Sequence, residues 1–461
     1  MSSPFLGLSV ASSALRAFQR ALDTTGHNLA NVNTAGYSRQ SVDFSNIDPL
    51  AYFQNGWKFQ GQGVFTGAVT RARDMFLDNS FQNASSDLSK FNSASSGMKA
   101  IDGIFNEPSA DGIADGLGKL FDAFSALAAN PSDPAARSQV QLAGQNLADR
   151  VRGRYSALMG QQANQQGSIT TTIGQINSLA GQISALNKEI SKYNSSSGPP
   201  NDMLDARDRA VDELSKLVDI KKYAQPDGSY TIYAAGSLLV DSGGARAFPA
   251  NYDATTGTVS DASGTYTVRS GELAGQMTSL NQTKARMADL DTLANTLRTQ
   301  INNVHSTGTN ALGNTGVQFF NDVAAGPQTG AIDFDLSAAV KASPKAIAAG
   351  VSGAPGDGGL AQAISNMRDT NIAGLGNQTF GVFFQGVINV VASTAQFYSG
   401  KADTQTAVVQ QVDNQRQAVS GVSMDDELAN MQKLQRSYQA AAKALTIFDQ
   451  VTQDTINMVN R

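Results

Sequence analysis

Very few side chains in this sequence have the type and spacing needed for acid–base or nucleophilic chemistry. The 461 residues include no cysteine, which excludes disulfides, thiol catalysis and thiolate metal sites. The two histidines, His27 and His305, lie near the ends of helical patterns, and neither has a partner at a suggestive spacing. We therefore expect both to be surface or capping residues.

One cluster of acidic residues could be mistaken for a metal site or a catalytic pair. It consists of Asp202, Asp205, Asp208, Asp212 and Glu213. Arg207 and Arg209 are interleaved with these carboxylates, which is typical of a solvated, salt-paired helix face. The glycine-rich stretches 61–63 and 353–359 lack the residues that complete a nucleotide-binding loop. The sequence thus predicts no catalytic, cofactor-binding or metal-binding residue, and a protein that is not an enzyme.

The composition restricts the class of partner. The net charge is -5 and no basic block is present, so we expect no nucleic-acid binding. Charged residues make up 16%, below the usual quarter, and such a surface suits close packing between subunits. We find no apolar run long enough to span a membrane and no basic region leading into an apolar core at the N-terminus. We therefore expect no membrane insertion and no cleaved secretory signal.

The elements that could position an interface lie at the two ends of the chain. Residues 2–30 and 423–461 both have helix patterns with one apolar seam. The first seam contains Leu8, Leu15, Leu22 and Leu29 on a strict heptad, with Phe18 beside them. The second contains Met424, Leu428, Met431, Tyr438, Ala442, Leu445, Thr452 and Ile456, flanked by Leu434, Ala441, Phe448 and Thr455. Seams at both termini fit either a helix pair within a monomer or assembly between subunits.

A long helix is predicted in the middle of the chain. Asp133 and Pro134 form a helix start, and no proline follows until Pro199, which allows a helix of about 60 residues and about 90 Å. Its second half predicts a coiled-coil seam with two rows, Ile169, Ile176, Ile183 and Ile190 in one and Thr172, Leu179, Leu186 and Tyr193 in the other.

Five glycines recur at one heptad position on the opposite face of this helix, and no charged side chain occurs between Arg154 and Lys188. They are Gly153, Gly160, Gly167, Gly174 and Gly181. Each should cost about 1 kcal/mol relative to alanine. One interpretation is a shallow groove against which a second chain lies. The other is a helix that tolerates glycine because its opposite face is well packed.

The remaining patterns complete the predicted fold class, mainly α with an inserted β domain. Residues 218–223 and 230–233 predict a hairpin around a Pro-Asp-Gly turn, and further short strands follow to residue 269. Long helices are predicted at 272–305 and 376–421. Trp57 lies among Tyr52, Phe53 and Phe59, where we expect a small local core more than a contact surface.

These patterns suggest a chain that folds back on itself in three layers. We predict a terminal helical domain from residues 1–45 with 422–461. We predict a long-helix coiled-coil bundle from 46–200 with 270–421, and a small outer β-rich domain from 201–269. The paired N- and C-terminal helices would therefore lie farthest from the β insertion.

Several stretches resemble the bacterial flagellar rod, hook and hook-associated proteins. Residues 28–40, Asn-Leu-Ala-Asn-Val-Asn-Thr-Ala-Gly-Tyr-Ser-Arg-Gln, are similar to the N-terminal signature of that family, and the Tyr-Ser-Arg-Gln ending resembles its hook-associated protein 1 branch. The similarity continues at 61–64, 70–78 and 130–137. Residues 420–443 resemble the family's closing motif.

The resemblance implies a structural adaptor between the flagellar hook and the filament. It implies polymerisation as a ring after type III export, and hence a secreted protein of the extracellular flagellum. The implied partners are copies of itself, the hook protein, the next hook-associated protein on the filament side and a flagellar export chaperone. The resemblance also implies that the paired terminal helices line the inner tube. Because each seam is short, we expect the ends to be loosely ordered until a partner covers them.

The candidate interface residues follow from the terminal seams and the signature. For assembly they are Leu8, Leu15, Phe18, Leu22, Leu29, Asn31, Asn33, Gly36, Tyr37, Leu428, Met431, Tyr438, Leu445 and Ile456. For the chaperone they are Leu428, Met431, Leu434, Tyr438, Leu445 and Phe448. Alternative functions are a secreted adhesin or effector whose β domain binds a surface ligand, or another flagellar rod or hook subunit. A peptidoglycan hydrolase would need a paired carboxylate cleft, for which only the acidic cluster offers residues.

Overall fold

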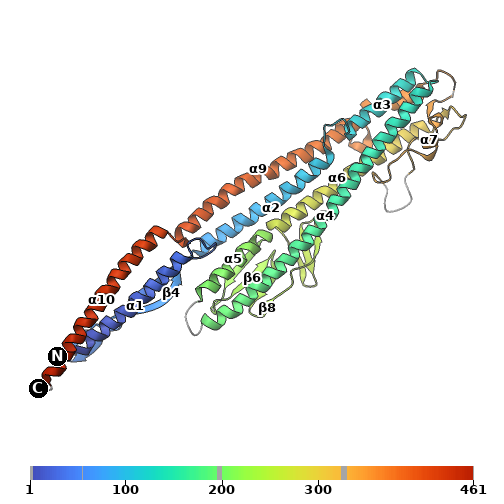
Figure 1. The fold of residues 1–461 in the computed structure, drawn as a ribbon. Helices are drawn as coiled ribbons and strands as arrows, with labels where there is room; N and C mark the ends of the chain where they lie inside the picture. The colour runs from blue at the N-terminus through green and yellow to red at the C-terminus, as the bar shows by residue number, and fades with distance from the viewer. Residues whose placement is uncertain (1–3, 54–55, 195–199, 323–329, 353, 460–461) are drawn as a thin grey trace. The chain divides into compact units, whose positions relative to one another are not determined.

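The computed structural model describes residues 4–53, 56–194, 200–322, 330–352 and 354–459 (Figure 1). It confirms the predicted fold class, because long helices dominate and short strands are inserted between them. The chain forms two compact units. Unit 1 comprises residues 1–88, 174–249 and 405–461, and unit 2 comprises residues 89–173 and 250–404. The three-domain division stays a prediction.

The two terminal helices of unit 1 lie side by side. They are α1 (Pro4–Ala30) and α10 (Met424–Val459) (Figure 1). After α1 the chain turns into β1 (Gln40–Asn46), which pairs antiparallel with β4 (Val64–Arg71) and lies against α1. Between these strands, β2 (Leu50–Phe53) and β3 (Trp57–Gln60) form a separate hairpin. Residues 28–40 thus join helix α1 to the strand pair of β1 and β4.

Unit 1 also contains a four-stranded antiparallel meander beside α5 (Asn201–Leu217). Its strands are β5 (Ile220–Ala224), β6 (Tyr230–Ala234), β7 (Ser237–Asp241) and β8 (Gly244–Ala245). Gly228, at φ +84°, closes the turn between β5 and β6. The predicted hairpin is therefore confirmed.

Unit 2 is built mainly from helices. It contains α3 (Ile113–Ala129), α6 (Gly271–His305) and parts of α2 (Met75–Phe105), α4 (Pro134–Asn194) and α9 (Phe380–Ser420). Shorter helices are α7 (Ala338–Ala342) and α8 (Gly359–Asn366), with 3-10 turns at Pro344–Ala346, Met367–Asp369 and Ala373–Leu375. The strands are β9 (Asn251–Asp253), β10 (Thr258–Asp261), β11 (Gly264–Thr267), β12 (Thr309–Asn310) and β13 (Ala348–Gly350).

Helix α4 has the predicted length, 61 residues, and one of the two predicted seam rows. The isoleucine row is buried. The second row is only partly right: Thr172 is buried, but Leu179 and Leu186 are only half-buried and Tyr193 is exposed, whereas Ile173 and Ala180 are buried. Packing positions along a helix alternate in steps of four and three, so the row that follows Ile169 begins four residues later, at Ile173. No described atom outside the helix lies within 4 Å of a β-carbon built on the five glycines, so neither interpretation of them is decided.

His305 does not lie at the surface, which corrects the expectation from the sequence. It is fully buried at the end of α6, where the Ala348 amide donates to Nε2 at 2.9 Å and Nδ1 lies 2.8 Å from the Val317 carbonyl oxygen. Because Nε2 accepts, Nδ1 carries the proton and donates. Burial lowers the pKa of His305 to about 4, so the neutral side chain bridges strand β13 and the segment at Val317.

One helical stretch, Phe380–Met458, is long and apolar enough to cross a membrane, judged by length and composition alone. This differs from the expectation that no run of that kind exists. Only 22% of its most apolar window is buried inside the chain. A single helix of this kind is weak evidence for a membrane span, so the absence of membrane insertion stays a prediction.

Candidate assembly interface

Helices α1 and α10 pack through small and polar positions. On α10 the buried residues Glu427, Leu434 and Thr452 belong to a series that alternates in steps of four and three. On α1 the buried residues include Ala11, Ala17, Ala21, Thr25 and Asn28. Short side chains let two helices approach closely. A β-carbon built on Gly7 would lie 2.7 Å from the ring of Phe448, which shows how close this approach is.

The predicted interface residues on α1 all lie half-buried in this pair. They are Leu8, Leu15, Phe18, Leu22 and Leu29. On α10, Leu434 is buried and Met431 and Leu445 are half-buried. Leu428, Tyr438, Phe448 and Ile456 are exposed. The predicted seam is therefore only partly right: its members Met431, Leu445 and Thr452 are covered, together with Leu434 of the flank, whereas Leu428 and Ile456 are exposed.

Helix α10 exposes apolar side chains that the sequence reasoning did not select. Ile447, Val451 and Met458 are 55%, 49% and 74% exposed, and their spacing of four and seven places them on one face. We call these three residues the outer apolar stripe. Among the described side chains of α1, no large hydrophobic residue is exposed to this extent. The spacing of these three residues was the signal for the stripe in the sequence. It was missed because the predicted seam on the same helix has a stronger apolar pattern.

A group of buried and half-buried polar side chains ties the turn after α1 to the start of α10. We call Asn28, Tyr37, Arg39, Gln40 and Glu427 the N-terminal lock. Asn28 Nδ2 donates to the Gln40 carbonyl oxygen at 2.9 Å and to Glu427 Oε2 at 3.2 Å. Asn28 Oδ1 accepts from the Gln40 amide at 3.0 Å and from the Tyr37 hydroxyl at 2.8 Å. Arg39 Nε donates to Glu427 Oε1 at 2.8 Å.

Glu427 is the centre of this lock, because its side chain is only 1% exposed. A carboxylate buried to that degree must be paired and hydrogen-bonded. Burial, with Asp202, Asp205 and Glu427 nearby, raises the pKa of Tyr37, so its hydroxyl stays protonated and donates. The motif at residues 28–40 therefore fixes where α10 begins.

The other signature residues shape the turn that carries the lock. Gly36 has φ +74°, and a β-carbon there would lie 2.4 Å from Arg209 Cγ, so only glycine fits. Asn31 Nδ2 donates to the His27 carbonyl oxygen at 3.0 Å, and Asn33 is exposed. Contacts of Asn31, Asn33, Gly36 and Tyr37 with a neighbouring subunit stay a prediction.

The acidic cluster is largely buried, which corrects the predicted solvated face. Asp205, Arg207 and Asp208 are 2–4% exposed. Asp205 accepts from the Ser38 amide at 3.0 Å and from Arg71 at 2.6 Å, and Arg71 also bonds Asp208 at 3.0 Å. Residues 201, 205, 208 and 212 share one helix face, and this face meets the strand pair. That helical spacing, together with the arginines at the end of β4, was the signal in the sequence.

The same face of α5 continues into a second set of ion pairs. Asp212 accepts from Gln82 and from Arg416, both at 2.7 Å. The Arg416 guanidinium lies 3.7 Å from the centre of the Phe81 ring. Only Asp202 and Glu213 have the exposure expected of the whole cluster. Within the described residues, no group of three or more acidic or histidine side chains could hold a metal ion.

Trp57 is on the surface, so the predicted local core is wrong. It is 71% exposed and packs edge-on against Phe53, which is 72% exposed. Leu50 and Phe59 of the same hairpin are also exposed. Two strands alone have no second layer to cover them, so these aromatic side chains cannot be buried by the hairpin itself.

Matches at the two ends and in the middle define the class of protein as a flagellar structural protein. Residues 8–37 match the family model described as "Flagella basal body rod protein". Residues 413–458 match the model described as "Flagellar basal body rod FlgEFG protein C-terminal". Residues 98–320 match the "Flagellar hook-associated protein FlgK helical domain". The two terminal matches cover α1 with its turn and nearly all of α10.

Whole-chain comparisons narrow this class. The chain is 30% identical to flagellar hook-associated protein 1 of Bacillus subtilis, over 99% of each chain. It is 26% identical to the protein of that name from Salmonella typhimurium, covering 94% of this chain and 96% of the relative, and 25% identical to that of Escherichia coli, covering 97% and 98%. The chain therefore belongs to the flagellar hook-associated protein 1 family.

A solved structure has the same fold. It is titled "The structure of the flagellar hook junction protein FlgK from Burkholderia pseudomallei", and it matches with a TM-score of 0.63 and 16% identity. The match covers 74% of this chain and 100% of the solved one.

Proposed function

We propose that the chain is a structural adaptor between the flagellar hook and the filament, and not an enzyme. The relatives carry the name hook-associated protein 1, and the solved relative is titled a hook junction protein. The observation that carries the proposal is the outer apolar stripe of α10. A helix already packed on one face has little reason to expose Ile447, Val451 and Met458 unless another surface covers them.

The adaptor would polymerise as a ring, with the hook protein on one side and the next hook-associated protein on the other. In a heterologous contact, one patch of a copy meets a different patch of the next copy. Repeating this contact gives a closed ring when the rotations between successive copies add up to a full turn. The exposed hairpin residues Phe53, Trp57 and Phe59 supply a second apolar surface on the same unit. Copies of one chain therefore carry two different surfaces that could meet.

The location follows from the same proposal. The chain would leave the cell uncleaved through the flagellar type III channel and act in the extracellular flagellum. A cytoplasmic chaperone would guard α10 before export, through Leu428, Met431, Leu434, Tyr438, Leu445 and Phe448. Leu434 is buried in the α1–α10 pair, and Phe448 lies against Gly7. Binding to this set therefore requires α10 to separate from α1, so the chaperone and α1 would compete for one face.

The outer apolar stripe can be tested with a matched pair of double variants. Ile447→Asp with Val451→Asp places two charges on the stripe. Gln432→Asp with Gln439→Asp places two charges on exposed polar positions of the same helix. In cells lacking the native protein, we expect both to be exported, but only the control to support filaments on hooks seen by electron microscopy. Normal filaments with the stripe variant would contradict the proposal.

The chaperone contact has its own control. Phe448→Glu should lower the affinity for the export chaperone at least tenfold in a calorimetric titration. Ile456→Glu should leave this affinity unchanged, because Ile456 is also an exposed apolar residue of α10 but lies outside the chaperone set. Equal affinities for both variants and the native chain would reject the assignment.

A further inference from the structure

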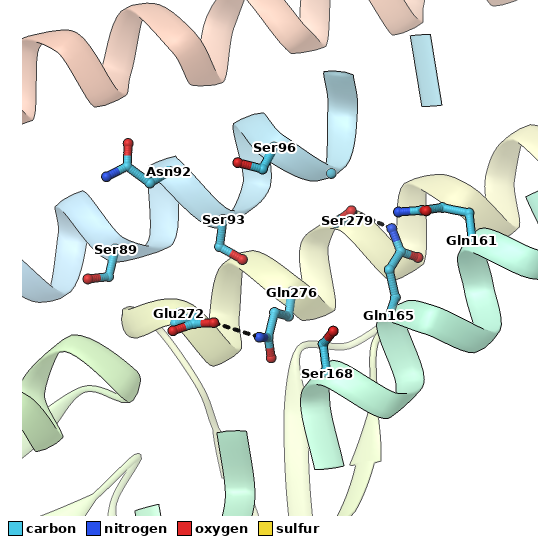
Figure 2. A pocket seen from close by; sticks show the side chains of 11 residues that line it. Ser89, Asn92, Ser93, Ser96, Gln161, Gln165, Ser168, Glu272, Gln276 and Ser279 are labelled. Carbon is cyan, nitrogen blue, oxygen red and sulfur yellow. Dashed lines mark hydrogen bonds between the residues drawn. The ribbon is translucent and has the colours of Figure 1, made fainter. Parts of the chain in front are cut away.

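Three helices of unit 2 line an open pocket of about 490 Å³, to which no apolar side chain contributes (Figure 2). Helices α2, α4 and α6 each contribute one face to it. The lining residues are Ser89, Asn92, Ser93, Ser96, Gly97, Gln161, Gln165, Ser168, Glu272, Gln276 and Ser279. A helical bundle normally fills such a space with leucine and isoleucine. Its polar lining therefore distinguishes this space from an ordinary helix-bundle core.

The small residues of α2 explain why the space exists. On that helix, Ser89, Ser93 and Gly97 are spaced by four, so they follow one helix face. A β-carbon built on Gly97 would lie 1.7 Å from Ser279 Oγ, so α2 and α6 are as close there as glycine allows. The short side chains beside this contact leave a volume that larger residues would fill.

The hydrogen bonds at the bottom of the cavity fix the orientation of two amides. Gln276 Nε2 donates to Glu272 Oε1 and to Thr172 Oγ1, each at 2.9 Å. Gln165 Nε2 donates to Ser279 Oγ at 2.6 Å, and Gln165 Oε1 accepts from Thr283 Oγ1 at 3.0 Å. Both amides are therefore held in one orientation, as Figure 2 shows for the bonds to Glu272 and Ser279.

One oxygen of this group has no donor. Gln276 is only 9% exposed, and its Oε1 has no hydrogen-bond partner in the described part of the chain. A buried acceptor without a donor is destabilising. A ligand donor in the cavity would remove that cost if the Gln276 side chain turns toward it, at the expense of its bonds to Glu272 and Thr172.

The lining restricts the chemistry of a ligand. No aromatic or aliphatic side chain lines the cavity, so an apolar molecule would meet only the short carbon stems of polar side chains. With no basic side chain, it does not suit phosphate or another anion. Its five serine hydroxyls and four side-chain amides can donate and accept, and Glu272 adds an acceptor. The matching ligand must also donate and accept on all sides.

We infer that this cavity binds a small polyhydroxylated molecule, a monosaccharide or polyol, through hydrogen bonds to α2, α4 and α6. Cavities of several hundred Å³ are the usual size for small-molecule sites. Because no ring can stack on the sugar, we expect affinities in the millimolar range. The source is either a free sugar or one unit of a longer glycan, and the two share this chemistry.

The test is a titration of the ¹⁵N-labelled full chain with glucose and with myo-inositol, followed by NMR. We expect saturable shifts of the Gln165 and Gln276 side-chain amides and of backbone amides around Gly97 and Ser279. In Gln276→Leu the half-saturating concentration should rise at least tenfold. In Gln166→Leu, whose side chain is exposed one residue outside the lining, it should not change.

A second variant covers the case in which Gln276→Leu does not fold. Ser168→Leu narrows the cavity from α4 and should also weaken binding at least tenfold. Maltotriose identifies the source: tighter binding than glucose supports a glycan unit, and weaker binding supports a free sugar. Two results would show a hydrated cavity without a ligand and would overturn the inference. Either the shifts grow linearly with sugar concentration without saturating, or both lining variants show the same shifts as the native chain.

Discussion

The aromatic core of unit 2 and the terminal helix pair of unit 1 use apolar side chains in opposite ways. In unit 2, Phe319, Phe320 and Phe334 are fully buried, with ring centres 4.4–4.8 Å apart. On α10, Ile447 and Met458 are more than half exposed. The first region completes its core from its own chain, whereas the second covers only one face of α10. An apolar pattern in the sequence therefore indicates burial, but not whether the partner belongs to the same chain.

The largest expected effect lies in the completed core. Phe320→Ala removes a fully buried ring between Phe319 and Phe334, and should lower the free energy of unfolding by about 3–5 kcal/mol. Ile447→Ala on the exposed stripe should change it by no more than about 0.5 kcal/mol. Urea unfolding of the monomeric chain measures both. Similar losses for the two variants would remove the contrast between the regions.

The buried His305 should make unit 2 sensitive to acid. Its pKa is about 4 in the folded chain, below the usual 6.5, because burial disfavours the charged form. Between pH 6.5 and 4 the unfolded chain binds a proton that the folded chain does not, so stability falls as the pH falls. The loss should reach about 3 kcal/mol at pH 4. The urea concentration at half-unfolding should differ less between pH 7 and pH 5 in His305→Gln than in the native chain. An equal difference in the two proteins would reject the role of His305 in acid sensitivity.

The N-terminal lock should have a smaller effect, confined to the terminal pair. Glu427→Gln keeps an acceptor for Asn28 but loses the charge that binds Arg39, at a cost of about 1 kcal/mol. We expect faster amide exchange in α1 and in the first turns of α10, with unchanged exchange in the unit 2 core. Asp426→Asn, a change at the exposed neighbouring position, is the control. If the two variants behave alike, the lock does not stabilise this pair.

Local patterns predicted several helices and turns, because their causes are local, but they gave no prediction of α2 and α3. The proline spacing gave the bounds of α4, and the Pro-Asp-Gly turn gave the first hairpin of the meander. The burial of Asp205 could not be predicted from α5 alone, since its partners Ser38 and Arg71 lie more than 130 residues away. His305 was misplaced for the same reason, because its partner Ala348 is 43 residues distant.

The candidate interface was predicted at the level of elements rather than residues. Both terminal helices were identified, but the buried Leu434 was assigned to the flank, and the exposed Leu428 and Ile456 were assigned to the seam. Two adjacent apolar rows on one helix cannot be ranked from spacing alone, because both satisfy a helical period. Their ranking depends on which row meets the small residues of α1, and this is a tertiary property.

The most direct test of the account is amide hydrogen exchange of the full chain, free and assembled at the hook–filament junction. In the free chain, we expect α10 from Ile447 to Met458 to exchange orders of magnitude faster than the buried stretch of α6 around Leu293 and Leu297. Assembly should slow exchange in α10 and leave α6 unchanged. If residues 8–29 and 428–458 are already strongly protected in the free chain, the terminal pair is complete without a partner and the account is contradicted.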